Sequence, residues 1–314
     1  MTDSGYLYGM QEYKYTVAEH AFSVQAAEGI DLTAALAPYA PFADRDKTAA
    51  GAGGSTSPGP GTVFLLTVVQ AEELPVPEKL ALEFEQDDDG SQIRVFRPEA
   101  DGGSWFEFLL HGRLSGRMRT DAEFGTAVLS VHTDPDFALN NALMVLYALR
   151  TARQGTALFH AAAVAYKGRG YLFLGRSGTG KSTHARLWLK HIPGAELLND
   201  DNPVVRVFPD GTARVYGSPW SGKTPCYRNL DLPAGGFVQL AQAPHNDIRR
   251  LRGLGAYAAL VASISGKRWD RNLADGLHET EEALTARIPV WHLDCLPDEA
   301  AARLCRDTIA TKQE

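Results

Sequence analysis

The chain has 314 residues, with 38 acidic and 31 basic side chains and a formal net charge of −7. Hydrophobic residues make up 44% and charged residues 22%, which excludes wholesale disorder and is typical of a globular protein. The length predicts two domains of ordinary size.

Several function classes are disfavoured by the same composition. No basic run indicates nucleic-acid binding, and no run approaches the ~18 apolar residues of a membrane helix. The first residues have neither the basic start nor the apolar run of a signal peptide. The three cysteines, at 226, 295 and 305, form no CxxC pair and predict neither a disulfide framework nor a zinc site. We therefore expect a cytoplasmic protein with reduced thiols and no membrane partner.

The first part of the chain predicts an antiparallel sheet. Short apolar or alternating runs spaced by turn residues indicate strands at 63–69, 80–85, 93–96 and 105–110. Residues 87–90 read DDDG; they lack the spaced ligands of a calcium loop and favour a hairpin turn. Residues 46–62 are rich in Gly, Ser, Ala and Pro, which predicts a mobile loop. A surface insertion is the favoured interpretation of this loop and a lid is the alternative.

A helix is expected next. Asp134 is a suitable N-cap, Pro135 suits the first helical position, and leucines recur at helical spacing from Leu139 towards residue 153. We therefore divide the chain into an N-terminal α+β domain at 1–133, a connecting helix at 134–154 and a second domain at 155–314.

The second domain alternates strands and helices, as an α/β domain does. Apolar runs predict strands at 158–166, 171–174, 197–198, 204–208 and 288–293, and helical patterns lie at 181–191 and 298–310.

A glycine-rich motif lies between the second of these strands and the first helix. Residues 175–182 read GRSGTGKS and fit the P-loop pattern G-x-x-x-x-G-K-[ST]. The glycines allow backbone angles closed to other residues, and the loop amides with the helix dipole attract phosphate. Lys181 is expected to contact the outer phosphates and Ser182 a Mg²⁺ ion. The predicted nucleotide-binding residues are Gly175, Ser177, Gly178, Thr179, Gly180, Lys181, Ser182 and Thr183.

Two acids follow the motif. Asp200 and Asp201 end a short predicted strand beyond Lys181, where one carboxylate is suited to Mg²⁺ and the other to accepting a proton from an attacking hydroxyl. His160 precedes the motif. Taken alone it is typical of a packed core histidine, but beside Asp200 it would orient that acid or tune its proton affinity.

The order of His160, the glycine-rich loop and the paired aspartates resembles the catalytic domain of bacterial HPr kinase/phosphorylase. That domain belongs to the phosphoenolpyruvate-carboxykinase-like P-loop superfamily, and the resemblance covers about residues 155–310. It implies a P-loop kinase domain, here preceded by a mainly antiparallel α+β domain. It further implies ATP and Mg²⁺ as cofactors, Ser182 and Asp201 at the metal, and Asp200 as base with His160 beside it. The roles of the two aspartates are interchangeable at this stage, and the oligomers of the family leave a homo-oligomer open.

The resemblance has one departure. The family carries a Glu-x-Arg-Gly-x-Gly signature about 25 residues after the aspartates, whereas residues 216–223 read YGSPWSGK. Because that signature is associated with phosphorolysis, we predict a kinase without phosphorylase activity and do not expect HPr itself as acceptor. In the segment 217–229, Lys223 and Arg228 are candidate cations for the transferring phosphoryl group, the alternative being a structural loop with a buried Trp220.

The predicted function is therefore ATP-dependent transfer of the γ-phosphoryl group to a hydroxyl, on a serine of a protein or peptide or on a small molecule. Two alternatives remain: a nucleotide-binding ATPase or switch, and a scaffold that binds nucleotide without turnover. A GTPase base-reading motif and an ABC signature are both missing from the sequence. Arg249, Arg250 and Arg252 form a basic cluster whose favoured interpretation is a solvated face.

Overall fold

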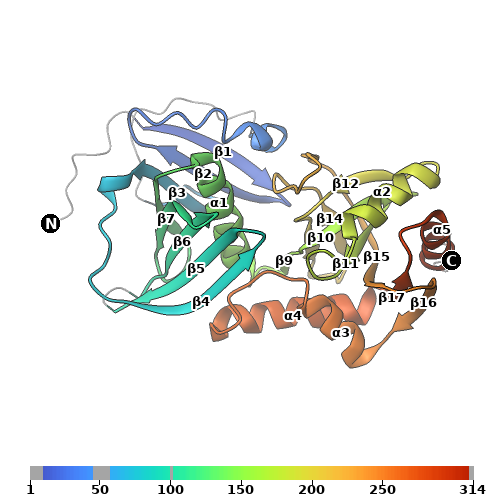
Figure 1. The fold of residues 1–314 in the computed structure, drawn as a ribbon. Coiled ribbons are helices and arrows are strands. Elements are labelled where there is room, and N and C mark those ends of the chain that lie inside the picture. The colour runs from blue at the N-terminus through green and yellow to red at the C-terminus, as the bar shows by residue number, and fades with distance from the viewer. Residues whose placement is uncertain (1–9, 45–56, 100–101, 311–314) are drawn as a thin grey trace. The chain divides into compact units, whose positions relative to one another are not determined.

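The computed structural model describes residues 10–44, 57–99 and 102–310, and residues 46–56 of the predicted mobile loop lie outside them (Figure 1). The protein is a mixed α/β protein with two separate sheets, and it divides into two compact units, Met1–Arg150 and Thr151–Glu314. No helix in the described part of the chain is both long and apolar enough to cross a membrane.

The first unit is built on an eight-stranded sheet in the order β1-β2-β3-β8-β7-β6-β5-β4. Neighbouring strands are antiparallel except at β2–β3 and β3–β8, which are parallel. The strands are β1 (Gln11–Val17), β2 (His20–Ala26), β3 (Thr62–Gln70), β4 (Leu80–Asp88), β5 (Ser91–Pro98), β6 (Trp105–Leu110), β7 (Arg113–Thr120) and β8 (Thr126–Val131). Two short 3₁₀ helices, η2 (Ala37–Phe42) and η3 (Ala71–Glu73), lie in the connections.

The predicted connecting helix is α1 (Pro135–Thr151). Its apolar side is fully buried, and it approaches β7 so closely that a Cβ on Gly116 would lie 2.8 Å from the Cβ of Ala138. Asp134 lies at the start of this helix, where its carbonyl accepts from the Ala138 amide at 3.1 Å. Its φ is 48°, and its carboxylate accepts a 2.8 Å bond from Arg113.

The second unit has a nine-stranded sheet in which β15 is the central strand. The order runs β12-β10-β11-β15-β14-β13-β9, and β17 pairs with β15 and with β16. Its strands are β9 (Thr156–Leu158), β10 (Ala161–Tyr166), β11 (Arg169–Leu174), β12 (Glu196–Asn199), β13 (Val204–Val207), β14 (Ala213–Tyr216), β15 (Asp231–Gln242), β16 (Asp247–Leu251) and β17 (Val290–Cys295). Its helices are α2 (Lys181–His191), α3 (Gly253–Val261), α4 (Arg271–Arg287) and α5 (Glu299–Ile309).

The single strand predicted at 158–166 is wrong, because the chain breaks at Phe159 and His160 into two strands with different partners. β9 pairs with β13, whereas β10 pairs with β11 and β12. At the break the His160 amide donates to the Ser263 carbonyl at 2.7 Å, so that this residue leaves both ladders. The apolar composition of the run concealed the break, since both strands are buried.

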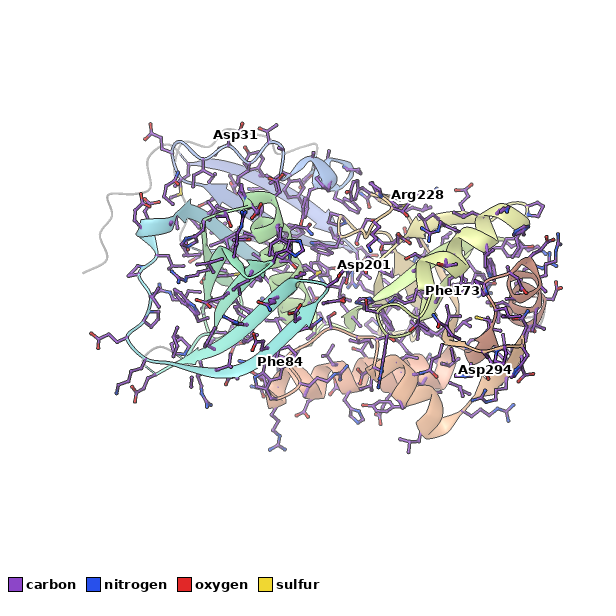
Figure 2. All side chains as sticks on the ribbon, viewed as in Figure 1. Asp31, Phe84, Phe173, Asp201, Arg228 and Asp294 are labelled. Carbon is purple, nitrogen blue, oxygen red and sulfur yellow. The ribbon has the colours of Figure 1, made fainter. Side chains whose placement is uncertain are left out.

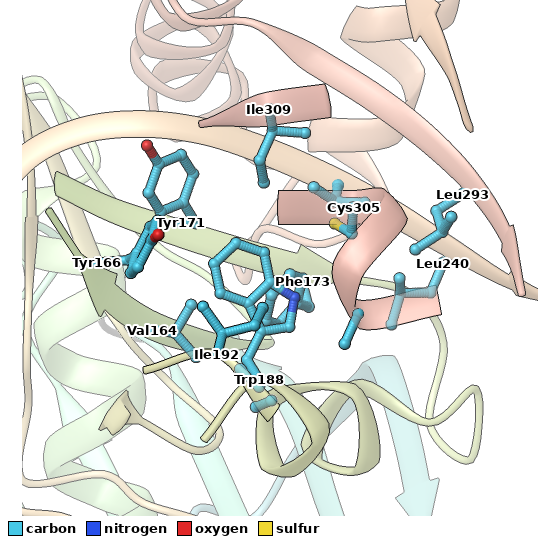
Figure 3. Packing of buried hydrophobic residues seen from close by; sticks show 14 of the residues in the cluster. Val164, Tyr166, Tyr171, Phe173, Trp188, Ile192, Leu240, Leu293, Cys305 and Ile309 are labelled. Atoms are coloured by element: carbon cyan, nitrogen blue, oxygen red, sulfur yellow. The ribbon is translucent and has the colours of Figure 1, made fainter. Parts of the chain in front are cut away.

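A buried core joins α2 and α5 to the sheet (Figure 3). Trp188 lies at its centre and is 0% exposed, with ring centroids 5.5 Å from Phe173, 5.8 Å from Tyr166 and 5.9 Å from Tyr171. Its indole nitrogen donates to His184 Nε2 at 3.2 Å, so the one polar atom of the ring is satisfied. This core fixes the helix that begins at Lys181 onto the strand that ends at Leu174.

We expect Trp188→Ala to lower the free energy of unfolding by about 3–5 kcal/mol, because it removes a fully buried indole and leaves a cavity. Urea unfolding followed by circular dichroism measures the change. Trp269→Ala is the matched control: Trp269 is 42% exposed and should lose about 1 kcal/mol or less. Equal losses in the two variants would contradict the central place of Trp188.

Candidate functional site

The register of three neighbouring strands brings the predicted site residues to one edge of the sheet. β10 is antiparallel to both β11 and β12, with Ala161 opposite Leu174 and Ala163 opposite Asn199. The end of β11, the start of β10 and the end of β12 therefore lie side by side, with strands spaced about 4.8 Å apart. The glycine-rich loop follows the end of β11, and the paired aspartates follow the end of β12. His160 immediately precedes the start of β10.

The glycine-rich loop has a strand–loop–helix form. It connects the end of β11 to the first residue of α2. Gly178 and Gly180 have φ of 77° and 106°, in the left-handed region that L side chains rarely adopt. Gly180 is the N-cap and no side chain caps the helix, so the first-turn amides of α2 are available to an anion. The strand before the motif and the helix after it are therefore as the sequence predicts.

Lys181 is bent back over this loop. Its residue is 7% exposed, and its Nζ donates to the carbonyl of Gly175 at 3.0 Å and to that of Arg176 at 3.3 Å. The Arg176 carbonyl also accepts from Thr179 Oγ1 at 2.7 Å. The ammonium group therefore lies at the loop, where its charge can meet a bound phosphate once these carbonyls release it.

The remaining residues of the motif line the loop and the first turn of α2. Ser177 is exposed, whereas Ser182 and Thr183 are half-buried on the helix. A contact that the motif does not reveal joins the loop to the neighbouring parallel strand, because Gln242 Nε2 donates to the Gly178 carbonyl at 3.2 Å. Gln242 ends β15, and its distance from the motif in sequence explains why the pattern does not point to it.

The two aspartates have different surroundings, although they are adjacent. Asp200 is 4% exposed, and its Oδ2 accepts from the Thr224 amide at 3.2 Å. The Asp201 side chain is 35% exposed; its Oδ2 accepts from Asn202 at 2.8 Å and its Oδ1 lies 3.8 Å from His160 Nε2 (Asp201 is labelled in Figure 2). The structure thus brings His160 beside Asp201.

Asn199 holds the backbone of the aspartate pair. This residue is 0% exposed, and its Oδ1 accepts from the amides of Asp201 and Asn202, each at 2.8 Å. Its Nδ2 donates to Ser218 Oγ at 3.1 Å and to the Trp220 carbonyl at 3.2 Å. One buried amide therefore links the aspartate turn to the loop that follows β14. The sequence alone does not point to Asn199, since an Asn before two Asp residues is typical of any polar turn.

We expect Asn199→Ala to destabilise the protein by about 2–3 kcal/mol, because buried amide and carbonyl groups lose their partner. Any activity of this edge should fall with it, since the aspartate turn loses its support. Asn272→Ala is the control of the same residue type, at an exposed position in the first turn of α4. Chemical unfolding of both variants compares them, and equal stability of the two would contradict the role assigned to Asn199.

At this edge of the sheet, the loop 217–229 contributes backbone atoms and not the Trp220 side chain. Trp220 is 1% exposed and so is a buried structural residue. A Cβ on Gly222 would lie 3.2 Å from the Cβ of Asp201, so the backbone here passes directly over the aspartates. Lys223 is exposed beside this contact.

Arg228 has its contacts elsewhere. It donates to the Leu197 carbonyl at 2.8 Å and pairs with Glu196 at 2.8 Å, near the start of β12 and away from the aspartates at its end (Arg228 is labelled in Figure 2). Of the two candidate cations, Lys223 is the one that belongs to the backbone segment over the aspartates, between Gly222 and Thr224.

Other candidate groups lie apart from this edge. Arg249 pairs with Asp294 at 3.3 Å, and Arg250 lies 5.0 Å from the centre of the Trp291 ring. Burial raises the pKa of the Cys226 thiol, which favours the unreactive protonated form. Burial also lowers the pKa of His184 to about 4, so that this histidine, below the glycine-rich loop, is neutral at physiological pH.

The described residues contain no group of three or more His, Cys, Asp or Glu side chains that could hold a metal ion.

Comparisons with known proteins give a distant structural likeness. No family model and no curated protein matches the chain. Among solved structures, an HPr(Ser) kinase/phosphatase from Coxiella burnetii is 13% identical, with a TM-score of 0.29, over 49% of this chain and 93% of that one. The likeness is too distant to assign an activity to this protein.

Proposed function

We propose that the protein is an ATP-dependent kinase that transfers the γ-phosphoryl group to a hydroxyl with the help of Mg²⁺. The observation that carries the proposal is the meeting of a glycine-rich phosphate loop, its lysine and two carboxylates at one edge of a sheet. Phosphoryl transfer needs little more than these parts, because its catalysis is mostly positioning and charge stabilisation.

Each group has a role in this proposal. The loop amides and Lys181 bind the phosphates, and Ser182 with Asp201 binds Mg²⁺. Asp200 accepts the proton of the acceptor hydroxyl, and His160 orients the acid pair. The same geometry permits the reversed assignment, in which Asp201, the more exposed of the two and 3.8 Å from His160, is the base and Asp200 binds Mg²⁺.

The acceptor is a hydroxyl of a serine in a protein or peptide, or of a small molecule. Lys223 is exposed beside the aspartates and is the cation best suited to the phosphoryl group during transfer. The resemblance of the motifs to HPr kinase supports a serine acceptor, while the missing Glu-x-Arg-Gly-x-Gly signature argues against phosphorolysis.

The competing function is a nucleotide-binding ATPase, switch or scaffold. The acid pair, of which Asp200 is buried and Asp201 half-buried, favours the kinase, because a paired aspartate beside a phosphate loop provides a base for a hydroxyl in addition to a metal ligand. A scaffold that only binds nucleotide would need the loop but no proton acceptor beside it.

Incubation with γ-labelled ATP and Mg²⁺ in an extract from which small molecules have not been removed tests the proposal. We expect label on an acceptor with the unaltered protein, and about a 1,000-fold lower transfer rate with Asp200→Asn, because the proton acceptor is removed. Asp210→Asn, on an exposed turn of the same unit, is the control and should transfer normally.

The outcomes separate the functions. Label released only as free phosphate would favour an ATPase, and ATP binding without any turnover would favour a scaffold. A loss in Asp200→Asn that excess Mg²⁺ partly restores, together with a loss in Asp201→Asn that it does not restore, would exchange the roles of the two aspartates.

A further inference from the structure

A buried carboxylate on α4 takes no part in the proposed chemistry. Glu281 is 0% exposed and belongs to the middle of α4. Its Oε1 accepts from Arg268 Nη2 at 2.6 Å, and its Oε2 accepts from the Tyr257 hydroxyl at 3.0 Å. A charge buried to this degree persists only with a partner, so Arg268 is required to neutralise Glu281.

Arg268 connects this carboxylate to the segment between α3 and α4. The same Nη2 lies 3.2 Å from the Val261 carbonyl and 3.4 Å from the Ile264 carbonyl. The guanidinium group therefore ties the end of α3 and the residues after it to α4. One terminal nitrogen makes all three contacts, and the shorter side chain of a lysine would not place its ammonium at the same point.

The segment held by Arg268 is the one that holds His160. The Ser263 carbonyl accepts from the His160 amide at 2.7 Å, and the Ser265 amide donates to the Leu158 carbonyl at 3.0 Å. Phe159 and Ile264 form an isolated β-bridge between these two contacts. The break between β9 and β10, from which His160 reaches towards Asp201, is thus secured on one side by residues 263–265.

We propose that Arg268 is a positioning residue for His160: anchored on buried Glu281, it fixes residues 261–265, and these fix the backbone from which the His160 side chain meets the paired aspartates. The catalytic part of this inference rests on the proposed function. An error of about 1 Å at a catalytic group can cost up to about 100-fold in rate, so a distant anchor of this kind affects turnover without touching substrate.

Arg268→Lys in the full chain tests this inference, with two readouts. The first is hydrogen exchange at the His160 amide, followed by NMR, which requires no activity. The second is transfer of γ-label from Mg·ATP to any acceptor, including water. We expect exchange about 10-fold faster and transfer about 10-fold slower, with the KM for ATP within about two-fold, because the phosphate loop is untouched.

Two further variants keep the test decisive. Tyr257→Phe removes the other hydrogen bond to Glu281 and leaves Arg268 in place, so it should change neither readout. If Arg268→Lys does not fold, the double variant Arg268→Met with Glu281→Gln removes both charges together, so that no unpaired charge is left buried. This double variant should also show faster exchange at His160.

Unchanged exchange at His160 and unchanged transfer in a folded Arg268 variant would overturn the inference, even if the variant were less stable. The same changes in Tyr257→Phe would also overturn it, because they would indicate general loosening of α3 and α4. Absence of label transfer by the unaltered protein would contradict the proposed function and the catalytic part of this inference. Exchange at His160 would then still decide whether Arg268 holds that residue.

Discussion

Replacing Lys181 with alanine is expected to reduce phosphoryl transfer by about 100- to 1,000-fold, the range found when one preorganised charge or donor is removed from a transition state. The ammonium group lies on the carbonyls of the glycine-rich loop, and in the proposed function its loss removes the positive charge that meets the outer phosphates. Filter binding of labelled transfer product, at ATP concentrations above and below the KM, measures whether the loss is in kcat, in ATP binding or in both.

The control for this variant lies on the same helix. Lys190→Ala removes an exposed ammonium from the last turn of α2 and should leave transfer unchanged. Thermal unfolding should place both variants close to the unaltered protein, since the Arg176 carbonyl keeps its bond from Thr179 when Lys181 is lost. Normal transfer by a folded Lys181→Ala variant would remove this residue from the site.

The second large effect is expected at the metal. Asp201→Asn should raise the Mg²⁺ concentration that gives half-maximal transfer by about 10-fold or more, because a neutral amide is a weaker ligand for a hard cation than a carboxylate. A magnesium titration at fixed ATP measures the shift. Excess Mg²⁺ should restore part of the activity, as it would not if Asp201 acted as the base.

Asp247→Asn, an exposed aspartate at the start of β16, controls for the change in net charge. An identical magnesium titration for Asp201→Asn and the unaltered protein would exclude Asp201 as a ligand. Complete loss that no concentration of Mg²⁺ relieves would favour the reversed assignment, with Asp201 as base and Asp200 at the metal.

The parts of the site that are local in sequence could be predicted. The apolar strand before residue 175 and the helix over 181–191 are β11 and α2 in the structure, and the glycines that the motif requires have positive φ. Each of these features is determined by residues close to it in sequence, in the same strand, turn or helix. The pattern of glycines, lysine and helix signals therefore contains enough information to predict them.

Elements that depend on distant partners were missed. β15 contains Pro233 and a Gly235-Gly236 pair, which argue against a strand, yet it lies at the centre of the second sheet. α4 carries many polar residues and Gly276, where a Cβ would lie 2.8 Å from the Ala152 carbonyl. The glycine that weakens the helical pattern is there because another part of the chain approaches closely.

The same reason limits the prediction of the site. Asn199 and Gln242 are polar residues at strand ends, and only the register of the sheet reveals that one supports the aspartates and the other contacts the glycine-rich loop. Arg228 is the opposite case. Its position after the aspartates suggested a cation for the phosphoryl group, but its guanidinium is bound to Glu196 and the Leu197 carbonyl.

The length of β15 has a consequence for how the second unit unfolds. Its first residues pair with β14, and its later residues pair with β11 on one side and β17 on the other. Among the described strands, detachment of β15 would separate the β9–β13–β14 ribbon from the strand that carries the glycine-rich loop. Partial opening of this unit is therefore costly, and its two halves should melt in a single cooperative transition rather than one after the other.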